Sequence, residues 1–320
     1  MEKIALKDKK ILFELDLDSR QPNSRIAKKV GLSKQLLGYK INQLIKKGII
    51  TEFITTINPS LLGYSHFKIY LRLMNITTNK EQEIINYLIN HKNTFWIASA
   101  RGRYDLIASF YAKNITEFSS LLREFLNKYG NRILDKNIVI LESAKSYTSS
   151  YLLEGKMHQE RTYGGVYKNI ELDEADKKIL STLSQNARLN NLDIAEKLKV
   201  SHDKIRYRLK KLRENGIITG FGTKLDFGKL GYQYNLITFN LSNISLEKQK
   251  QIDFFVGNSK NIIHYINTLG SHEMEFEIEI SSQEELDKLI REVRDSFSKE
   301  IKDYEIIQII KEHKINYYPF

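Results

Sequence analysis

The sequence repeats itself at a constant offset of 168 residues, and this repeat constrains the fold more than any other feature. Residues 8–12 and 176–180 both read Asp-Lys-Lys-Ile-Leu, and Leu-Gly-Tyr recurs in the same register at 62–64 and 230–232. Because each repeat has the size of a domain, it is too long to be one turn of a solenoid. The sequence therefore predicts a tandem duplication.

Each copy divides into two zones with different periodicity. The first zone carries apolar residues at helical spacing, and the second combines alternating strands with two helical stretches. Turn-forming residues gather between the copies, around 146–150 and 164–165. We therefore expect two small modules, two larger modules and one linker, at residues 1–64, 65–143, 144–171 (the linker), 172–232 and 233–320.

The excess positive charge lies in the two small modules. The chain has 50 Lys and Arg against 39 Asp and Glu, a net charge of +11. Residues 1–64 contribute +6 and residues 172–232 contribute +5, so the rest of the chain sums to zero. This distribution indicates a polyanion as the partner of the small modules.

The composition narrows the chemistry that we expect. The absence of cysteine removes disulfides, thiolate zinc sites and cysteine nucleophiles. The seven histidines show no helical zinc spacing, and no phosphate-binding loop or nucleophile elbow is found. No apolar run approaches the length of a membrane span. We expect a cytoplasmic protein with no metal, no cofactor and no membrane partner.

The small modules read as three helices followed by a short strand. In copy 2, Asp173 is expected to cap the first helix and Ser201 the third, and a strand follows from Ile217 as the wing. Ser33 is expected to cap the third helix of copy 1. Each third helix has one apolar stripe, formed by Leu37, Ile41 and Leu44 or by Ile205, Leu209 and Leu212.

The opposite face of each third helix is polar and basic, which suits entry into the major groove of DNA. A helical bundle whose basic face is merely solvated is the alternative, but the same face occurs in both copies and favours double-stranded DNA as partner. The candidate DNA contacts are Ser33, Lys34, Gln35, Tyr39, Lys40 and Gln43 in copy 1, and Ser201, His202, Lys204, Arg206, Tyr207, Arg208, Lys210 and Lys211 in copy 2.

Residues 173–232 resemble the DNA-binding domain of the Lrp/AsnC (feast/famine) transcriptional regulators. The likeness is carried by Asn186-Ala187-Arg188, Ile194-Ala195, Ser201-x3-Ile205-x2-Arg208-Leu209-x2-Leu212, Gly216-Ile217-Ile218 and Leu230-Gly231. Copy 1 matches with Lys40 at the usual arginine position. The resemblance implies a winged helix-turn-helix domain followed by an effector-binding domain. Two copies in one chain imply an intrachain pseudo-dimer, with further homo-oligomers left open.

The larger modules read as strand, helix, strand, strand, helix, strand. This order is the ferredoxin-like pattern, an antiparallel sheet with both helices on one face. In copy 1 the strands are expected around 67–73, 95–100, 106–111 and 138–141. The predicted fold class is α+β, with two winged helix-turn-helix domains and two ferredoxin-like sensor domains in tandem.

The resemblance places a small effector, often an amino acid, near a Gly-x-x-Asp turn. Glycine frees backbone N–H groups for a carboxylate, and an acidic side chain can hold an ammonium group. Glycine in a hairpin turn also needs no ligand to explain it. The candidate effector residues are Gly102, Arg103, Tyr104 and Asp105 in copy 1, and Gly270, His272 and Glu273 in copy 2.

One strand of copy 2 carries a row of glutamates, Glu273, Glu275, Glu277 and Glu279, on a single face. A bare row of like charges is unfavourable unless it is solvated or countered. Residues 233–320 have a net charge of −5 and residues 65–143 a net charge of +4. We therefore hypothesise that the two sensor modules pair with each other; a solvated acidic strand is the alternative.

The sequence favours a sequence-specific DNA-binding transcriptional regulator, not an enzyme, modulated by an amino acid or a similar effector. Siroheme decarboxylases share this two-domain architecture, but they usually carry a His-Asn-Tyr stretch followed by an arginine and a histidine. Residues 264–272 read His-Tyr-Ile-Asn-Thr-Leu-Gly-Ser-His, without the arginine. The sequence is also compatible with a protein that coats chromosomes without sequence preference and with an interaction scaffold. Because the two third helices differ in sequence, we expect an asymmetric operator.

Overall fold

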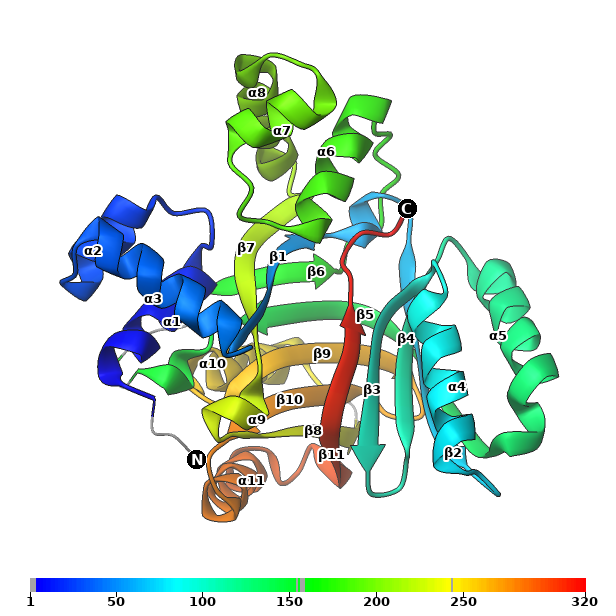
Figure 1. The fold of residues 1–320 in the computed structure, drawn as a ribbon. Coiled ribbons are helices and arrows are strands. Elements are labelled where there is room, and N and C mark those ends of the chain that lie inside the picture. Colours follow the sequence, from blue (N-terminus) through cyan, green and yellow to red (C-terminus); the bar gives the residue numbers. More distant parts are fainter. Residues whose placement is uncertain (1–3, 154, 156–158, 243) are drawn as a thin grey trace.

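The computed structural model describes residues 4–320 apart from residues 154, 156–158 and 243. Each small module consists of three helices and a strand, as the periodicity predicts (Figure 1). In copy 1 these are α1 (Leu6–Leu17), α2 (Asn23–Val30), α3 (Lys34–Lys46) and β1 (Ile50–Ile57); in copy 2 they are α6 (Glu174–Gln185), α7 (Asn191–Leu198), α8 (His202–Glu214) and β7 (Ile218–Leu225).

The expected caps start the third helices. The Ser33 side chain accepts a hydrogen bond from the N–H of Leu36, and the Ser201 side chain accepts one from the N–H of Lys204. Asp173 caps α6 in the same way. The apolar stripe of each third helix is buried against the two preceding helices, so the polar face is left outward.

The strand after each third helix pairs across the two copies. β1 and β7 run antiparallel from the pair Ile50–Leu225 to the pair Ile57–Ile218. The strand from Ile217, predicted to be a wing within its own module, therefore belongs to a ribbon shared by both small modules. The ribbon buries Ile57 and Phe221 and joins the two modules into one body.

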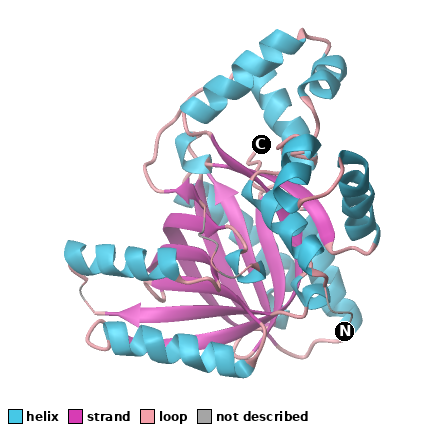
Figure 2. Cartoon of the chain, turned by 90° about the vertical axis from the view of Figure 1, so that its left-hand side faces the viewer, coloured by secondary structure: helices cyan, strands magenta, loops and turns pink. Residues whose placement is uncertain are grey.

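Both larger modules have the predicted order of strands and helices, with the helices packed on one face of each sheet (Figure 2). Copy 1 consists of β2 (Ser65–Leu73), α4 (Thr78–Asn90), β3 (Thr94–Arg101), β4 (Leu106–Ala112), α5 (Ile115–Tyr129) and β5 (Ile133–Tyr147). In copy 2, the short helix α9 (Phe227–Leu230) precedes β8 (Gln233–Leu241), α10 (Leu246–Asn258), β9 (Ile262–Gly270), β10 (Met274–Ile280), α11 (Gln283–Phe297) and β11 (Ile301–Ile315).

The two sheets close into one barrel. The strands follow the order β2-β4-β3-β11-β8-β10-β9-β5, and β5 pairs back with β2. The last strand of each copy therefore pairs with the second strand of the other copy, β5 with β9 and β11 with β3. Closure leaves each sheet with one face toward its own helices and one face toward the barrel interior.

The segment 144–171, expected to be a linker, is largely structured. β5 continues to Tyr147, a 3₁₀ turn covers Ser150–Leu152, and β6 (Glu160–Gly164) pairs with the end of β5. Arg161 and Tyr163 on β6 are buried. The connection between the copies thus contributes side chains to the interior. Among the described residues, no helix combines the length and the apolar character that a membrane crossing requires.

Candidate functional site

The two third helices, α3 and α8, present most of the candidate DNA contacts to solvent. The exposed candidates are Ser33, Lys34, Gln35, Tyr39 and Gln43 on copy 1, and Ser201, His202, Lys204, Arg206, Tyr207, Lys210 and Lys211 on copy 2. Arg206 lies 3.3 Å from Asp203 on the same helix, in a pair that is open to solvent and therefore weak. These side chains are exposed, and the bonds that some of them form lie within their own helix.

Two candidates, Lys40 and Arg208, are held within their own modules. The Lys40 ammonium is 2.7 Å from Asp8 on α1, and the Arg208 guanidinium donates to Asp173 and Asp176 of α6 at 2.7 and 2.8 Å. The two positions are equivalent in the repeat. In each small module this residue forms an ion pair that connects the third helix to the first helix or its cap. A hydrogen bond to the Asp176 N–H and the bond from Arg208 lower the pKa of the Asp173 carboxyl.

A reciprocal exchange of arginines joins the two small modules. Arg20 donates to the carbonyls of Ala187 and Leu189 and to the Asn191 side chain, the bond to Ala187 being 2.7 Å long. Arg188 donates to the Ser19 carbonyl and to the Asn23 side chain. Arg188, Ser19 and Asn23 lie 168 positions from Arg20, Ala187 and Asn191, and only the bond to Leu189 has no counterpart among these contacts. The contact is therefore a pseudo-twofold interface, the kind that a symmetric dimer makes.

A groove of about 630 Å³ opens between the two small modules. Lys34 and His202, the first residues of α3 and α8, line it together with Arg20 and Arg188. Asn23, Asn190 and Asn191 add amide groups to the wall. The starts of both third helices thus flank one basic, hydrogen-bonding groove on the pseudo-twofold axis, which suits an anionic partner.

The acidic side chains of both expected effector turns bond to backbone N–H groups of their own module. Asp105 accepts the backbone N–H of Leu73, and Glu273 accepts that of Leu241, at 2.7 and 2.8 Å. Each acidic side chain therefore ties its turn to the neighbouring strand. Gly270 is needed for packing as well, since a Cβ there would lie 2.5 Å from the Ile138 carbonyl oxygen.

The other residues of these turns also have partners. Arg103 is half-exposed and lies 3.9 Å from Asp135 and 3.8 Å from Glu305. Tyr104 is buried and its hydroxyl accepts from the Asn137 side chain. His272 turns into the barrel. The glycine at the remaining position, Gly102, has a φ of 131°, in the region that favours glycine.

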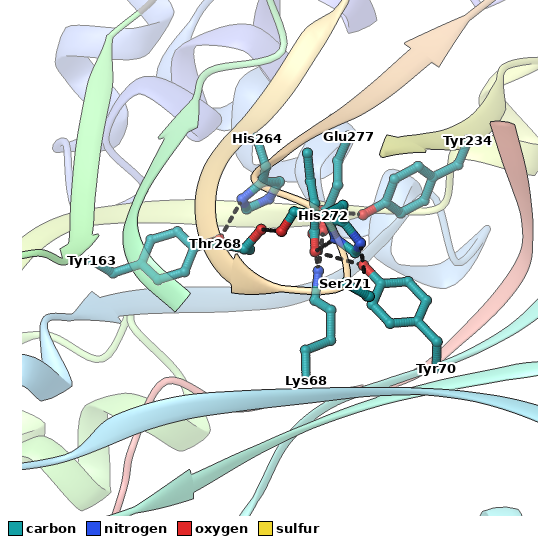
Figure 3. A network of polar contacts seen from close by, with 10 residues as sticks. Lys68, Tyr70, Tyr163, Tyr234, His264, Thr268, Ser271, His272 and Glu277 are labelled. Atoms are coloured by element: carbon teal, nitrogen blue, oxygen red, sulfur yellow. Dashed lines mark hydrogen bonds and ion pairs between the residues drawn. The ribbon is translucent and has the colours of Figure 1, made fainter. Parts of the chain in front are cut away.

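Three glutamates of the predicted row, Glu275, Glu277 and Glu279, lie on β10 and are buried in the barrel interior, where Lys68 of β2 meets the first two (Figure 3). The fourth, Glu273, precedes β10 and is exposed, so the expectation of a single face does not hold for it. The Lys68 ammonium is 2.5 Å from Glu275 and 3.4 Å from Glu277, and all three side chains are buried. The Tyr70 hydroxyl and the His272 ring also bond to Glu275, at 2.6 and 2.8 Å. The alternative of a solvated acidic strand is wrong for Glu275, Glu277 and Glu279, because they are at most 7% exposed.

The network sets the charge states of its members. Burial alone would raise the pKa of Glu275, but Lys68 and His272 outweigh it and lower that pKa to about 2. Burial would lower the pKa of Lys68, yet Glu275 and Glu277 hold it above its usual value. The pair is therefore ionised inside the barrel, and it bridges the two copies.

Sequence reasoning did not find the other polar groups of the interior. The Tyr163 hydroxyl is 2.9 Å from the His264 ring, and Tyr234 donates to Glu277 (Figure 3). The Trp96 indole donates to Glu312 at 2.7 Å. Alternation along a strand shows which residues share a face, but it does not show what lies opposite that face.

Comparison with known proteins agrees with this architecture. A family model described as winged helix-turn-helix DNA-binding matches residues 5–51 and 172–219. An uncharacterized HTH-type transcriptional regulator of Pyrococcus furiosus is 30% identical over 128 residues, which are 39% of this chain and 82% of that protein. The transcriptional regulator LrpA of Pyrococcus horikoshii is 45% identical over 67 residues, or 21% of this chain and 48% of that protein.

The chain belongs to the Lrp/AsnC family of HTH-type transcriptional regulators. This Lrp/AsnC protein contains two copies of the family's unit, so each relative matches less than half of it. The crystal structure of the siroheme decarboxylase NirDL matches the Lrp/AsnC protein along its length, with a TM-score of 0.62 and 17% identity over 98% of this chain and 94% of that one. At this identity the likeness shows a shared fold.

Proposed function

We propose that this Lrp/AsnC protein is a sequence-specific transcriptional regulator that binds double-stranded DNA as a dimer built within one chain. The observation that supports this most is the pair of exposed basic helices α3 and α8, whose modules are joined by Arg20 and Arg188. The first residues of such helices read base edges in the major groove, and the basic flanks contact phosphates. The groove between the modules offers further cations to the backbone.

The two helices differ at their reading positions, so the proposal includes an asymmetric site. α3 begins Lys34-Gln35, whereas α8 begins His202-Asp203 and continues to Arg206. A guanine is the usual base contact of an arginine. The proposal therefore assigns Arg206 to base recognition in one half-site only.

Selection from a randomised pool of duplex DNA tests the proposal directly. We expect one enriched site whose two halves differ. Arg206→Ala should cost about 1–3 kcal/mol of binding free energy at a single base pair. The matched control is Lys210→Ala on the same helix, which should weaken binding to all sequences equally.

Three outcomes would contradict parts of the proposal. Enrichment of symmetric sites only would contradict the proposal that the two half-sites differ. Salt-dependent binding without any enriched sequence would indicate a chromosome-coating protein instead. No binding at low salt would leave only the scaffold function.

The barrel interior supports a regulator rather than an enzyme of the siroheme decarboxylase type. A tetrapyrrole with several carboxylates requires a wide cationic pocket, but two interior cavities measure only about 80 and 20 Å³, and Glu312 lines both of them. Cations line them as well, Arg161 and Lys224 in the larger cavity and Lys68 in the smaller one. Iron-uroporphyrin III added to the purified chain is therefore expected to give no saturable shift of its absorbance band. A saturable shift would favour an enzyme of the siroheme decarboxylase type instead.

An amino-acid effector is part of the family expectation, and we keep it as a hypothesis at the turns that contain Gly102 and Gly270. Backbone N–H groups and the free oxygens of Asp105 and Glu273 are the groups that would meet it. DNA affinity measured with and without a mixture of amino acids tests it. An unchanged affinity for the selected site would contradict modulation.

A further inference from the structure

A cavity of about 80 Å³ lies where the small modules meet the barrel. Its wall combines Asp16 of α1 and Thr223 of β7 with Glu279 of β10 and Glu312 of β11. A smaller cavity of about 20 Å³ also reaches Glu312. The space exceeds that of a single water molecule, and Arg161, Lys224 and His264 line it together with these acidic residues.

The negative charge at this cavity is only partly balanced. Arg161 lies 3.6 Å from Asp16 and also donates to nearby backbone carbonyls, so Asp16 has a counterion. Within the described part of the chain, neither Glu279 nor Glu312 forms an ion pair; Lys224 lines the cavity without pairing with either. Burial raises the pKa of Glu279 to about 8, and Glu312, Asp16 and Glu277 add to the rise. Such a carboxyl lacks a cation.

The cavity also contains an unused hydrogen-bonding group. The Thr223 hydroxyl is buried, and among the described residues it has no hydrogen-bond partner. A buried hydroxyl without a partner is costly, and most such groups are satisfied by a ligand or by water. Thr223, Glu279 and Glu312 thus give the lining of this cavity three oxygen acceptors.

We propose that this cavity binds a small primary amine in its ammonium form, between the carboxylates of Glu279 and Glu312 and the hydroxyl of Thr223. An ammonium group has three N–H donors, which matches three acceptors. Among the described residues, no group of three or more His, Asp or Glu side chains is arranged to hold a metal ion. The proposal does not depend on DNA binding.

The chain carries its own reporter for this site. Trp96 is the single tryptophan of the sequence, and its indole N–H donates to Glu312 at 2.7 Å. A cation that binds Glu312 changes the environment of this indole. We therefore expect methylammonium chloride, titrated into the full chain at pH 8.5, to change the tryptophan emission with half-saturation on the order of 10 mM, as suits a ligand of two heavy atoms.

A control salt and three variants complete the experiment, at constant ionic strength set with sodium chloride. Tetramethylammonium, which has the charge but no N–H donors, should produce no saturable change. Glu279→Gln keeps the Trp96–Glu312 bond and should weaken the response at least tenfold, whereas Glu171→Gln, at an exposed position outside the cavity, should respond as the wild type does. Removing an unpaired buried carboxylate does not threaten folding, and Glu312→Gln gives a second test of the same site.

Several results would overturn the proposal. One is an equal response to tetramethylammonium, and another is an unchanged response in Glu279→Gln. A saturable response to potassium chloride with none to methylammonium would assign the cavity to a metal cation. Because the titration contains no DNA, none of these results decides whether α3 and α8 bind DNA.

Discussion

The pair of small modules and the barrel interior show two different results of the same duplication. In the small modules the contacts are repeated, because Arg20 and Arg188 each donate hydrogen bonds to the other copy. Each guanidinium also lies over an aromatic ring of the other copy, Arg20 over Phe221 at 5.3 Å and Arg188 over Phe53 at 5.5 Å. In the interior the contact occurs once. Lys68 meets Glu275 and Glu277, whereas the positions 168 residues away from these are Leu236, Ile107 and Ser109.

The difference between the repeated arginine contact and the single lysine–glutamate contact shows which part of the molecule selects the pairing of copy 1 with copy 2. The arginine exchange is self-complementary, so two identical copies would form it as readily as two different ones. Two first copies paired through their barrels would leave Lys68 facing Ile107 and Ser109, and two second copies would bury glutamates against Leu236. Buried charges without a partner are strongly unfavourable. The interior therefore specifies the pairing of copy 1 with copy 2.

The largest expected effect concerns this interior pair. Lys68→Met should destabilise the chain by about 3–5 kcal/mol, because it removes the ammonium that two buried carboxylates share. Urea unfolding followed by circular dichroism measures the loss. The matched control is Lys80→Met, which removes an exposed ion pair with Glu83.

The control should lose far less stability than Lys68→Met. Adding Glu275→Gln and Glu277→Gln to the Lys68 variant should restore more than half of the loss, since the stranded charges are then gone. Equal losses in the two lysine variants would show that the interior pair does not select the pairing.

The repeated contact should respond symmetrically. Arg20→Ala and Arg188→Ala each remove hydrogen bonds from a charged donor to acceptors of the other module, so each should cost about 1–3 kcal/mol. Unfolding free energies of the two variants, measured under the same conditions, check this. A loss confined to one of them would break the symmetry that the contacts show.

Much of the local structure could be predicted from the sequence. The caps at Ser33 and Ser201, the apolar stripes of α3 and α8 and the order of the sheet elements follow from spacing and side-chain chemistry over a few residues. The charge difference between the larger modules also indicated that they face each other, and Lys68 with Glu275 is the contact that results.

The roles of single cations were harder to predict. Lys40 and Arg208 belong to the same basic face as Tyr39 and Arg206, but they bind acidic residues of the first helix of their module. An arginine that crosses to another module, such as Arg188, has no local signature either. Barrel closure and the β1–β7 ribbon join strands far apart in sequence, and periodicity carries no information about such partners.

Glu279, a buried carboxyl group without an ion-pair partner among the described residues, gives a prediction about the pH dependence of stability. The pKa of Glu279 is about 8 in the folded chain against an ordinary value of 4.5, so from pH 4.5 to 8 the folded state holds a proton that the unfolded state releases. This group therefore lowers stability as the pH rises. Glu279→Gln should melt as the wild type does near pH 4.5 and should be more stable above pH 8, by a few kcal/mol at most.

Melting curves of both proteins between pH 4.5 and 9 measure this difference. The groups around Glu279 are Asp16, Glu277, Glu312 and Tyr151, with Arg161 and Lys224 as the neighbouring cations. None of them is altered in the variant. A difference that stays constant with pH would show that Glu279 is ionised in the folded chain, as a bound cation would make it.

The smallest expected effect comes from making the two small modules more alike. Arg208 bonds to two carboxylates, Asp173 and Asp176, whereas among the described residues Lys40 bonds to Asp8 alone. The copy 1 position that corresponds to Asp173 is Ala5, which starts α1 without a side-chain cap. Ala5→Asp should supply that cap and stabilise the chain by about 1 kcal/mol.

The double variant Ala5→Asp with Lys40→Arg tests whether the two-carboxylate contact of Arg208 can be reproduced in copy 1. A guanidinium binds two carboxylates at once, so the double variant should gain more than the sum of the two single variants in urea unfolding. Lys40→Arg alone should gain little, because Asp8 is then its only partner. If the gains are merely additive, the contact of Arg208 with two carboxylates in copy 2 depends on the placement of α6 rather than on these residue types. The two modules then differ more than their shared contacts indicate.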